Sequence, residues 1–251
     1  MPELPEVEHS RRDLERWIRR ATIVATKGEG KFALPSLRGR RIETVERRGK
    51  WIRIVLSDAT LLFNHHGMTG EWKRSDEPLR WERASLVVEK NGKRTRVAYV
   101  DPRKFGRLVV AREDIPSWSA LGPDPLEHGI DAKALADKLA RRRKRSIKEA
   151  LMDQSVLAGV GNIQATEALW KARIDPRSPA GALAKKHVTA VIKGLRWTIA
   201  RTLDDLDVGF VIYGHKGEPC PRCKTTLVRI VLGGRTTTFC PGCQERLRAR
   251  P

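Results

Sequence analysis

Residues 220–243 read CPRCKTTLVRIVLGGRTTTFCPGC and contain all four cysteines of the chain. Two Cys-x-x-Cys pairs, Cys220 with Cys223 and Cys240 with Cys243, flank sixteen residues that carry a β-type pattern. This spacing is typical of four thiolates that hold one tetrahedral Zn²⁺ between the arms of a β-hairpin, and a redox-active pair is the alternative. Because four thiolates leave no open coordination position, the sequence predicts one structural zinc ion rather than a catalytic one.

The hairpin expected between the cysteine pairs, TTLVRIVLGGRTTTF, carries two arginines, Arg229 and Arg235. A guanidinium group on a rigid hairpin suits bidentate binding of phosphate. A solvated surface arginine is the alternative, because most arginines are exposed.

The charge of the whole chain also points to an anionic partner. Its 251 residues include 50 Lys and Arg against 30 Asp and Glu, which gives a formal net charge of +20. With 40% hydrophobic residues, the chain has enough apolar material for a core, which argues against global disorder. A charge this large implies a polyanionic partner or an acidic membrane surface.

The sequence shows no apolar run long enough to cross a bilayer and no secretory signal, so we expect a cytosolic protein. Disulfides are rare in that compartment, which favours metal binding by the cysteines.

The pattern of apolar residues predicts a first region of mixed structure. Residues 5–20 carry a helical apolar stripe, whereas residues 51–56 and 60–63 alternate as strands do. The dipeptide Asn91-Gly92 is a hairpin signal. We therefore expect a helix packed on antiparallel sheet structure up to about residue 115.

After a turn-rich segment the pattern becomes helical, with apolar spacings at Leu135 and Leu139, at Ile147 and Leu151, and over residues 188–199. The predicted organisation is therefore a first domain over residues 1–116, a linker over 117–130, a helical domain over 131–210 and a zinc hairpin over 211–251.

Within the helical region, AGVGN at residues 158–162 interrupts a helical pattern that resumes from about Ile163. Two glycines and an asparagine allow a tight double turn. Asn162 would then lie near the start of the next helix, where backbone N–H groups and the helix dipole favour a phosphate. The alternative is a plain turn between two helices, with Asn162 as the helix cap.

The chain begins MPELPEVE, which places a proline second and two glutamates, Glu3 and Glu6, beside it. Removal of Met1, usual before a small residue, would leave Pro2 with a free secondary amine. An α-amino group titrates near pH ~8, so a useful fraction is an unprotonated nucleophile at neutral pH. Attack on an aldehyde or hemiacetal carbon gives a cationic iminium, and Glu3 or Glu6 can move protons beside it. The alternative is an ordinary helix start, with proline and glutamate in the first turn.

Taken together, these motifs resemble one family, the formamidopyrimidine-DNA glycosylase (Fpg) and endonuclease VIII (Nei) family. From Pro2 to Cys243 the following motifs occur in the family's order: MPELPEVE, RRGK, HHGMTG, DPRKFG, MDQSVLAGVGNIQATEALW, YGHKGEPC and the paired Cys-x-x-Cys. Arg103 and Phe105 favour the Fpg branch. The resemblance implies an α+β multidomain fold: an N-terminal antiparallel β-sandwich with an N-terminal helix, a helix–two-turn–helix domain and a C-terminal four-cysteine zinc finger, with DNA held in the cleft between.

The resemblance implies catalytic roles for four residues. Pro2 matches the nucleophile that attacks the sugar C1′ and forms a Schiff base. Glu3 matches the residue that assists base loss and sugar-ring opening by proton transfer, and Glu6 matches a supporting acid. Lys50, in RRGK, matches the lysine that contacts the phosphate at the lesion.

The resemblance also implies DNA-binding roles for five residues. Asn162 and Arg235 match the pair that grips the lesion phosphates. Met68, Arg103 and Phe105 match the side chains inserted into the duplex after the damaged base leaves the stack, which is the step that lets an enzyme reach the glycosidic bond.

The implied function is a bifunctional DNA glycosylase and abasic-site (AP) lyase of base excision repair. It would remove oxidised or ring-opened bases through a Schiff base at Pro2, followed by β,δ-elimination. The expected partner is double-stranded DNA with a damaged base or an abasic site, bound by a monomer in a bacterial-type cytoplasm near the nucleoid. The alternatives are a non-catalytic lesion- or structure-specific DNA-binding protein on the same scaffold, and a zinc-ribbon RNA-binding protein that leaves the N-terminus unexplained.

The chain departs from the family pattern in three places. The segment DDLDVGFVI, residues 204–212, has only nine residues where Fpg enzymes that excise 8-oxoguanine carry a longer loop over the flipped base. We therefore favour formamidopyrimidines, hydantoins, oxidised pyrimidines or abasic sites over 8-oxoguanine. Gln164 stands where Fpg members often have Tyr. His66 stands where an apolar residue is common, and we expect it half-buried at a strand end rather than catalytic.

Overall fold

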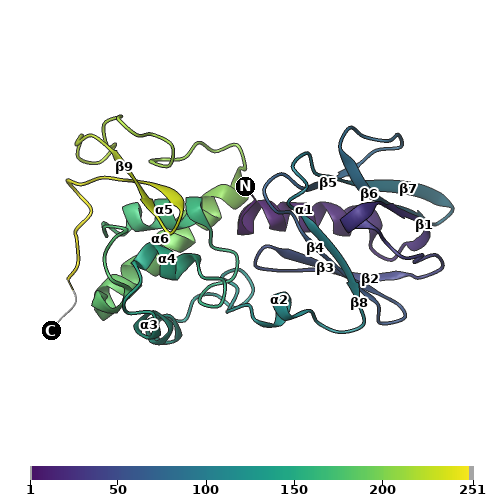
Figure 1. The fold of residues 1–251 in the computed structure, drawn as a ribbon, viewed down its shortest axis with the longest axis horizontal. Helices are drawn as coiled ribbons and strands as arrows, with labels where there is room; N and C mark the ends of the chain where they lie inside the picture. Colours follow the sequence, from purple (N-terminus) through teal and green to yellow (C-terminus); the bar gives the residue numbers. More distant parts are fainter. Residues whose placement is uncertain (1, 249–251) are drawn as a thin grey trace. The chain divides into compact units, whose positions relative to one another are not determined.

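A computed structural model describes residues 2–248 of the chain. The chain divides between Ala120 and Leu121 into two compact units (Figure 1). The expected removal of Met1 concerns a residue outside the described range.

The first unit consists of one long helix and two four-stranded antiparallel sheets. Helix α1 spans Leu4–Ile18. One sheet has the strand order β1-β6-β7-β5 and the other β2-β3-β4-β8. The strands are β1 (Thr22–Gly28), β2 (Ile42–Arg48), β3 (Trp51–Leu56), β4 (Leu61–His65), β5 (Glu71–Arg74), β6 (Glu82–Lys90), β7 (Lys93–Val100) and β8 (Arg107–Ala111), and a single 3₁₀ turn covers Gly30–Phe32.

The expected strands and turn of this unit are present. Strand β3 has the predicted bounds, and β4 begins one residue later and ends two residues later than the pattern 60–63 predicts. Asn91 and Gly92 form the turn between β6 and β7. The reason is local: a two-residue apolar period and a turn dipeptide are both encoded in neighbouring residues.

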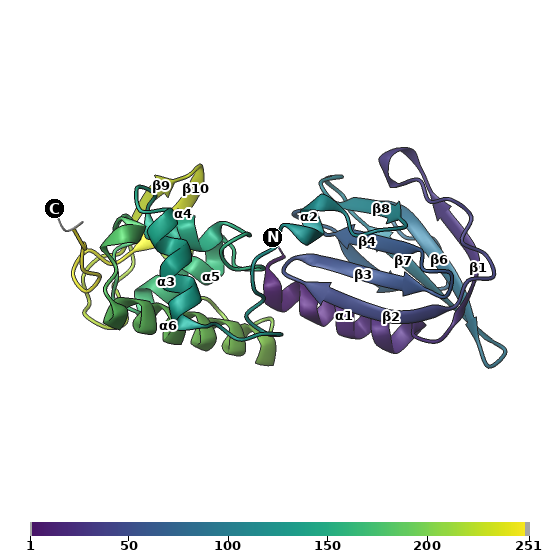
Figure 2. The ribbon, with the colours of Figure 1, turned by 90° about the horizontal axis from the view of Figure 1, so that it is seen from below.

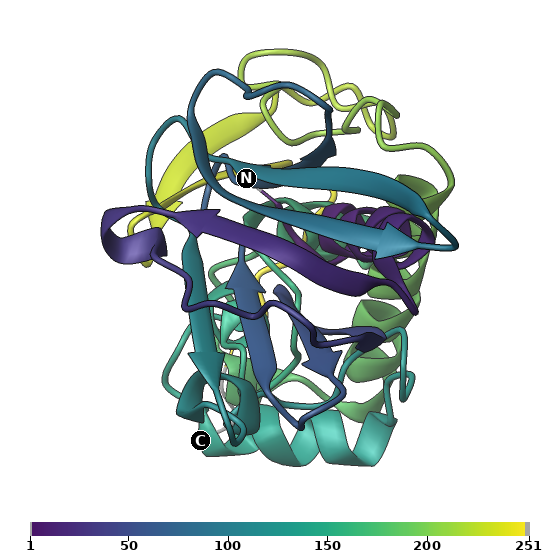
Figure 3. The ribbon, with the colours of Figure 1, turned by 90° about the vertical axis from the view of Figure 1, so that its right-hand side faces the viewer.

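The two sheets and α1 share one hydrophobic core. Ile23 and Val97 enter it from one sheet, Ile54 and Leu62 from the other, and Leu14 from α1. Figure 3 shows the strands of one sheet running across those of the other, an arrangement known from orthogonally packed sandwiches. Burying each such aliphatic side chain contributes about 1.5–3 kcal/mol. The predicted antiparallel β-sandwich with an N-terminal helix is therefore confirmed.

The expected linker, residues 117–130, is not a plain connection. Pro116–Ser119 form a short helix, α2, and Trp118 is buried against Phe63 with ring centroids 5.5 Å apart. Residues up to Ala120 thus belong to the first unit, and those from Leu121 belong to the second. The turn formers of this segment are visible in the sequence, but the packing of Trp118 on a distant strand is not.

The second unit combines helices with one two-stranded hairpin (Figure 2). The helices are α3 (Ala132–Arg141), α4 (Ile147–Met152), α5 (Asn162–Lys171) and α6 (Lys185–Asp204), with a 3₁₀ turn at Ala180–Ala182; the strands are β9 (Val228–Leu232) and β10 (Arg235–Phe239). The apolar spacings that predicted helices fall within α3, α4 and α6. In the described part of the chain, no helix combines the length and hydropathy that a membrane span requires.

Candidate active site and zinc centre

The N-terminus of α1 is built as a helix cap. Glu3 is the N-cap residue, and its backbone N–H donates to Oε2 of Glu6 at 2.9 Å. The Glu3 side chain faces the Glu6 backbone N–H in the reciprocal arrangement of a capping box. Glu3 is fully buried, whereas Pro2 and Glu6 are half-buried. The helix-start interpretation is therefore correct for the backbone, and the same cap holds two carboxylates beside Pro2.

Lys50 lies in the two-residue turn between β2 and β3, next to Gly49. Its charge lies close enough to the end of β4 to act on His65. Burial, with a smaller contribution from the charges of Lys50 and Arg107, lowers the pKa of His65 to about 4. His65 is therefore neutral at neutral pH, and its ring packs on Trp51 with centroids 5.0 Å apart.

Met68, Arg103 and Phe105 come from two loops that lie side by side. Met68 follows β4, and the other two follow β7. A Cβ on Gly67 would lie 2.5 Å from the backbone carbon of Phe105, so the two loops touch backbone to backbone. Phe105 is half exposed, with the Arg103 guanidinium 4.7 Å above its ring. The structure thus groups the three residues expected to enter DNA.

Asp101 joins these two loops. Its carboxylate, fully buried, accepts a hydrogen bond from Oγ1 of Thr69 at 2.6 Å and from the backbone N–H of Gly106 at 2.7 Å. The hydroxyl of Tyr99 fills the remaining space, because a Cβ on Gly70 or Gly106 would lie within 1.9 Å of it. Burial, reinforced by the charge of Asp101, raises the pKa of Tyr99 above its ordinary value.

His66, expected to be half-buried, is buried, with 3% of its surface exposed, and stacks on Tyr99. Neither ring nitrogen has a hydrogen-bond partner among the described residues. Burial lowers the pKa of His66 to about 3, so the ring is neutral. It is a core residue with no catalytic geometry.

The four cysteines converge in the second unit. Their sulfur atoms all lie within 4.8 Å of one another, with Sγ atoms 3.9 Å apart for Cys220 and Cys243 and 3.3 Å apart for Cys223 and Cys240. A tetrahedral site with Zn–S bonds of about 2.3 Å requires S···S separations of about 3.8 Å. The donor set therefore fits one zinc ion with no open position.

Two N–H groups compensate thiolate charge around this cluster. The indole Nε1 of Trp170 lies 3.5 Å from the Cys220 sulfur, and the Arg222 guanidinium lies 3.6 Å from the Cys243 sulfur. Such outer contacts orient the ligands and are typical of built metal sites. Trp170 also belongs to the apolar cluster that packs the cysteine loops onto α5.

Asn162 is the first residue of α5, and its side chain does not cap the helix. The N-cap residue is Gly161, so the interpretation of Asn162 as the cap is wrong. Its Nδ2 instead donates to the backbone oxygen of Thr236 at 3.0 Å, and its Oδ1 accepts from Lys148 at 2.5 Å. Because the Asn162 side chain makes these two bonds to distant residues, it is not placed to cap its own helix. Asn162 is thereby fixed against the residue that follows Arg235, which is exposed at the start of β10.

The segment that follows α6 is anchored by Glu167. This buried carboxylate of α5 accepts backbone N–H groups from Val211, Ile212 and Tyr213 at 3.1, 2.9 and 2.8 Å. The short connection after Asp204 is therefore fixed at its far end. Gln164, at the departure from the family pattern, is buried and donates to Thr202 on α6 at 3.2 Å.

Family models match the chain in three successive parts. They describe the formamidopyrimidine-DNA glycosylase N-terminal domain over residues 1–108, the helix–two-turn–helix domain of the same enzyme over 121–209, and a zinc finger found in FPG and IleRS over 217–246. The chain belongs to the formamidopyrimidine-DNA glycosylase family. The zinc-finger match and the sulfur geometry together establish the four cysteines as a structural zinc site.

Relatives match over nearly the full length. Formamidopyrimidine-DNA glycosylases of Desulfitobacterium hafniense and Thermus thermophilus are 38% and 37% identical, with 97% of this chain and 100% and 98% of those proteins covered. The first alignment is 277 positions long, so that relative carries residues that this 251-residue chain lacks.

Solved structures agree with the fold. The crystal structure of the MutM (Fpg) protein from Thermus thermophilus superposes with a TM-score of 0.87 at 33% identity, covering 98% of this chain and 99% of that one. A Lactococcus lactis Fpg in complex with DNA containing an abasic site gives 0.86 at 27% identity, covering 97% of this chain and 100% of that one.

Sequence reasoning missed several residues that build the site. Asp101, Arg47, Glu8 and Lys148 are buried charged groups, and in a sequence with 32% charged residues they look like solvated positions. Three of the four stand in motifs that carry the family resemblance, since Glu8 closes MPELPEVE, Arg47 opens RRGK and Asp101 opens DPRKFG. The contacts that join Glu8 to Arg47 and Lys148 to Asn162 and Thr237 link different elements, so no spacing along the chain points to them.

Proposed function

We propose that this protein is a bifunctional DNA glycosylase and AP lyase that acts on oxidised or ring-opened bases in double-stranded DNA. The observation that carries the proposal is the placement of Pro2 directly before the buried Glu3 cap, in a chain that matches the glycosylase family along most of its length. A terminal proline amine has one evident chemical use in such a setting, namely attack on an electrophilic sugar carbon.

The reaction would proceed by covalent catalysis. The Pro2 nitrogen donates its lone pair to C1′ while the glycosidic bond breaks and the base departs with a proton. The amine loses its proton, and the C1′–O4′ bond then breaks, so the sugar ring opens and a C=N⁺ bond forms at C1′. Glu3 or Glu6 would donate protons to the leaving base and to O4′. The resulting cationic iminium acidifies the C2′ proton, whose removal expels the 3′ phosphate. A second elimination expels the 5′ phosphate and leaves a one-nucleotide gap.

Cationic and polar groups would hold the phosphates on either side of the lesion. Lys50 is the candidate in the first unit, and Asn162 and Arg235 are the candidates in the second. The bonds from Asn162 to Thr236 and Lys148 support a joint role, because they tie the start of α5 to the strand that begins with Arg235. Phosphate contacts position the protein on the duplex without reading sequence.

Met68, Arg103 and Phe105 would fill the space that the extruded base leaves. Unstacking a base is unfavourable by a few kcal/mol, and inserted apolar side chains offset it while kinking the duplex. The Phe105 ring suits this role because it is 51% exposed and therefore accessible to a duplex. Arg103, stacked on that ring, can hydrogen-bond to the orphaned base.

We propose ring-opened purines, hydantoins, oxidised pyrimidines and abasic sites as substrates in preference to 8-oxoguanine. The support is the short segment after α6, whose end is pinned by three hydrogen bonds to Glu167. Because the segment of residues 204–212 is short and its end is fixed, few of its residues are available to cover a flipped base. The relatives named above are bacterial proteins, and we further propose that this protein works as a monomer in the cytoplasm, near the nucleoid.

Borohydride trapping on a duplex with an abasic site tests the proposal. Mass-verified protein without Met1 should form a covalent adduct, and Pro2→Gly should form much less while binding the duplex as before. Tight binding with neither adduct nor strand cleavage would replace the enzyme with the non-catalytic lesion-binding protein. Preference for single-stranded RNA over the lesion duplex would contradict both.

A further inference from the structure

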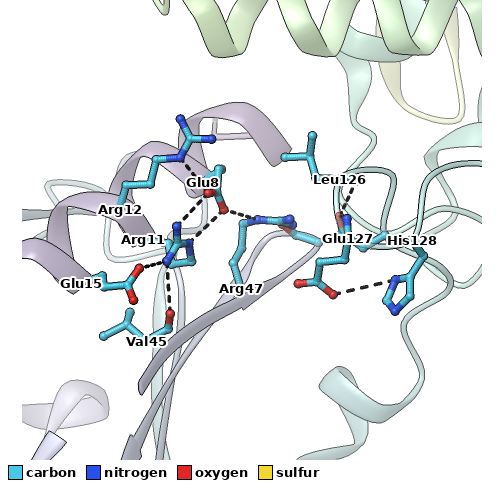
Figure 4. Close-up of polar contacts among 11 residues, drawn as sticks. Glu8, Arg11, Arg12, Glu15, Val45, Arg47, Leu126, Glu127 and His128 are labelled. Carbon is cyan, nitrogen blue, oxygen red and sulfur yellow. Dashed lines mark hydrogen bonds and ion pairs between the residues drawn. The ribbon is translucent and has the colours of Figure 1, made fainter. Parts of the chain in front are cut away.

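Glu8, on the second turn of α1, is surrounded by three arginines (Figure 4). Its carboxylate accepts hydrogen bonds from Arg11 at 3.0 and 3.1 Å, from Arg12 at 2.9 Å and from Arg47 at 2.9 Å. Burial raises the pKa of Glu8, but the hydrogen bonds from Arg11 and Arg47 lower it more, so the pKa lies below its ordinary value. Glu8 is therefore ionised at neutral pH and forms true ion pairs.

The three arginines differ in what else they touch. The Arg12 side chain is 54% exposed, and among the described residues its one ion-pair partner is Glu8. Arg11 also pairs with Glu15 on the same helix. Arg47 is different, because its side chain is only 2% exposed and it comes from β2 rather than from α1.

Arg47 uses two edges of its guanidinium group at once. Its Nε donates to Glu8, and one of its terminal nitrogens donates to the backbone oxygen of Gly49 at 3.1 Å. Gly49 is the first residue of the two-residue turn that continues with Lys50, and its φ of 59° is one that glycine adopts without strain. The planar, rigid fork thus connects helix α1 to the turn that presents Lys50.

At each end of the link from Glu8 through Arg47 to Gly49 there are residues of the proposed site. Glu8 lies on the helix whose first cap residue is Glu3, directly after Pro2, and Gly49 directly precedes Lys50. Figures 1 and 2 both show the start of α1 and the β2–β3 turn at the same end of the first unit. A shift of α1 against β2 would therefore change the separation between the nucleophile and the lysine.

We propose that Glu8 and Arg47 are positioning residues that hold Lys50 in register with the Pro2 amine. The inference rests on the proposed function, since it assumes that Pro2 and Lys50 act on the same nucleotide. Neither residue needs to touch the DNA. Misplacement of a reacting group by about 1 Å lowers rates by roughly 10²-fold, so a rigid buried link between helix and turn has a direct effect on catalysis.

The first test measures the link itself, independently of activity. In Arg47→Lys the charge remains, but one ammonium cannot reproduce the fork that reaches both Glu8 and Gly49. Hydrogen–deuterium exchange of the peptide that spans residues 48–52 should become about tenfold faster or more than in the wild type. Arg12→Met removes an ion pair from the same carboxylate without touching the turn, and it should leave that exchange unchanged.

The second test measures the consequence for chemistry. At saturating abasic duplex, the single-turnover rate of borohydride trapping should fall about 10- to 100-fold in Arg47→Lys, whereas Arg12→Met should stay within about twofold. Lys50→Met supplies the second arm of a double-mutant cycle. In the Lys50→Met background, Arg47→Lys should have little further effect, because the position of an absent ammonium no longer matters.

Should Arg47→Lys fail to fold, Glu8→Gln/Arg47→Met removes both charges and leaves no unpaired buried ion. Unchanged exchange at the turn in a folded variant overturns the proposal, and so does an equal loss of rate with and without Lys50. A wild-type protein that traps no adduct at all, despite a protected turn, would overturn the proposed function, and with it the catalytic role of the pair.

Discussion

Lys148 donates from Nζ to Oδ1 of Asn162 at 2.5 Å, and both side chains are buried in the second unit. The same ammonium group reaches Oγ1 of Thr237, also at 2.5 Å. A single buried lysine thus connects α4, the start of α5 and strand β10. Because β10 belongs to the zinc hairpin, this contact ties the hairpin to the helical part of the unit.

Replacing this lysine should loosen the hairpin. Lys148→Met leaves the Asn162 and Thr237 oxygens without their donor, so we expect the free energy of unfolding to fall by about 1–3 kcal/mol. Lesion-duplex affinity should fall as well. Lys186→Met, at an exposed position on α6, is the matched control and should stay within about 0.5 kcal/mol. Urea unfolding and duplex titration measure both effects, and equal stability of the two variants would contradict the prediction.

Loss of zinc should abolish DNA binding by the second unit. Cys240→Ser removes a buried thiolate from a four-thiolate site, and we expect less than one zinc ion per chain and loss of tight lesion binding. Val231→Ser, at a side chain that is 69% exposed on the same hairpin, should retain full zinc. Metal analysis of the purified variants measures the zinc content, and duplex titration measures the affinity for lesion DNA. Full affinity in a zinc-free Cys240→Ser protein would show that the metal has no part in holding the hairpin.

Asp101 should control the two loops that carry Met68 and Phe105. In Asp101→Asn the amide oxygen can still accept from Gly106 and the NH₂ group can donate to the Thr69 hydroxyl, but the negative charge that strengthens both bonds is lost, so we expect a loss of about 1 kcal/mol in stability. Base extrusion should also slow, because the common anchor of the loops is weakened. A fluorescent base analogue next to an abasic site reports the extrusion rate.

The control for this experiment is Asp114→Asn, whose carboxylate pairs with Arg53 at a more exposed position. Exposed pairs contribute about 0–1 kcal/mol, so its effects should be small. An Asp101→Asn protein with wild-type extrusion kinetics would argue against the anchoring role.

His66 should make the first unit less stable in acid. Its pKa in the folded protein is about 3, below the 6.5 of an unperturbed histidine. Below pH 6.5 the histidine is therefore protonated in the unfolded chain but not in the folded one. The free energy of unfolding then falls by up to about 1.4 kcal/mol per pH unit as the pH is lowered. Between pH 6.5 and about pH 5 this single residue would remove roughly 2 kcal/mol.

His66→Leu should flatten that dependence. The leucine fills a similar buried volume and binds no proton, so the difference between variant and wild type should grow as the pH falls. Urea unfolding at a series of pH values measures it, and the contributions of His65 and of the zinc thiolates cancel in the comparison. Parallel curves for the two proteins would mean that His66 is protonated in the folded state.

The sequence by itself determined the local parts of this protein. The strand period of residues 51–56, the turn at Asn91-Gly92, the proline and glutamates of the first helix and the two cysteine pairs each depend on neighbours within a few residues. Such features are encoded in short windows, because backbone geometry and tetrahedral metal ligation impose fixed spacings.

Only the tertiary structure decided which distant side chains meet. Trp118 packs on Phe63 where a linker was expected, and Asn162 bonds to Thr236 instead of capping its own helix. Glu8 with Arg47 is a further instance, because the two lie on a helix and a strand 39 residues apart. A buried charge needs a partner from whatever element packs against it, and that choice depends on the assembled core rather than on any period in the chain.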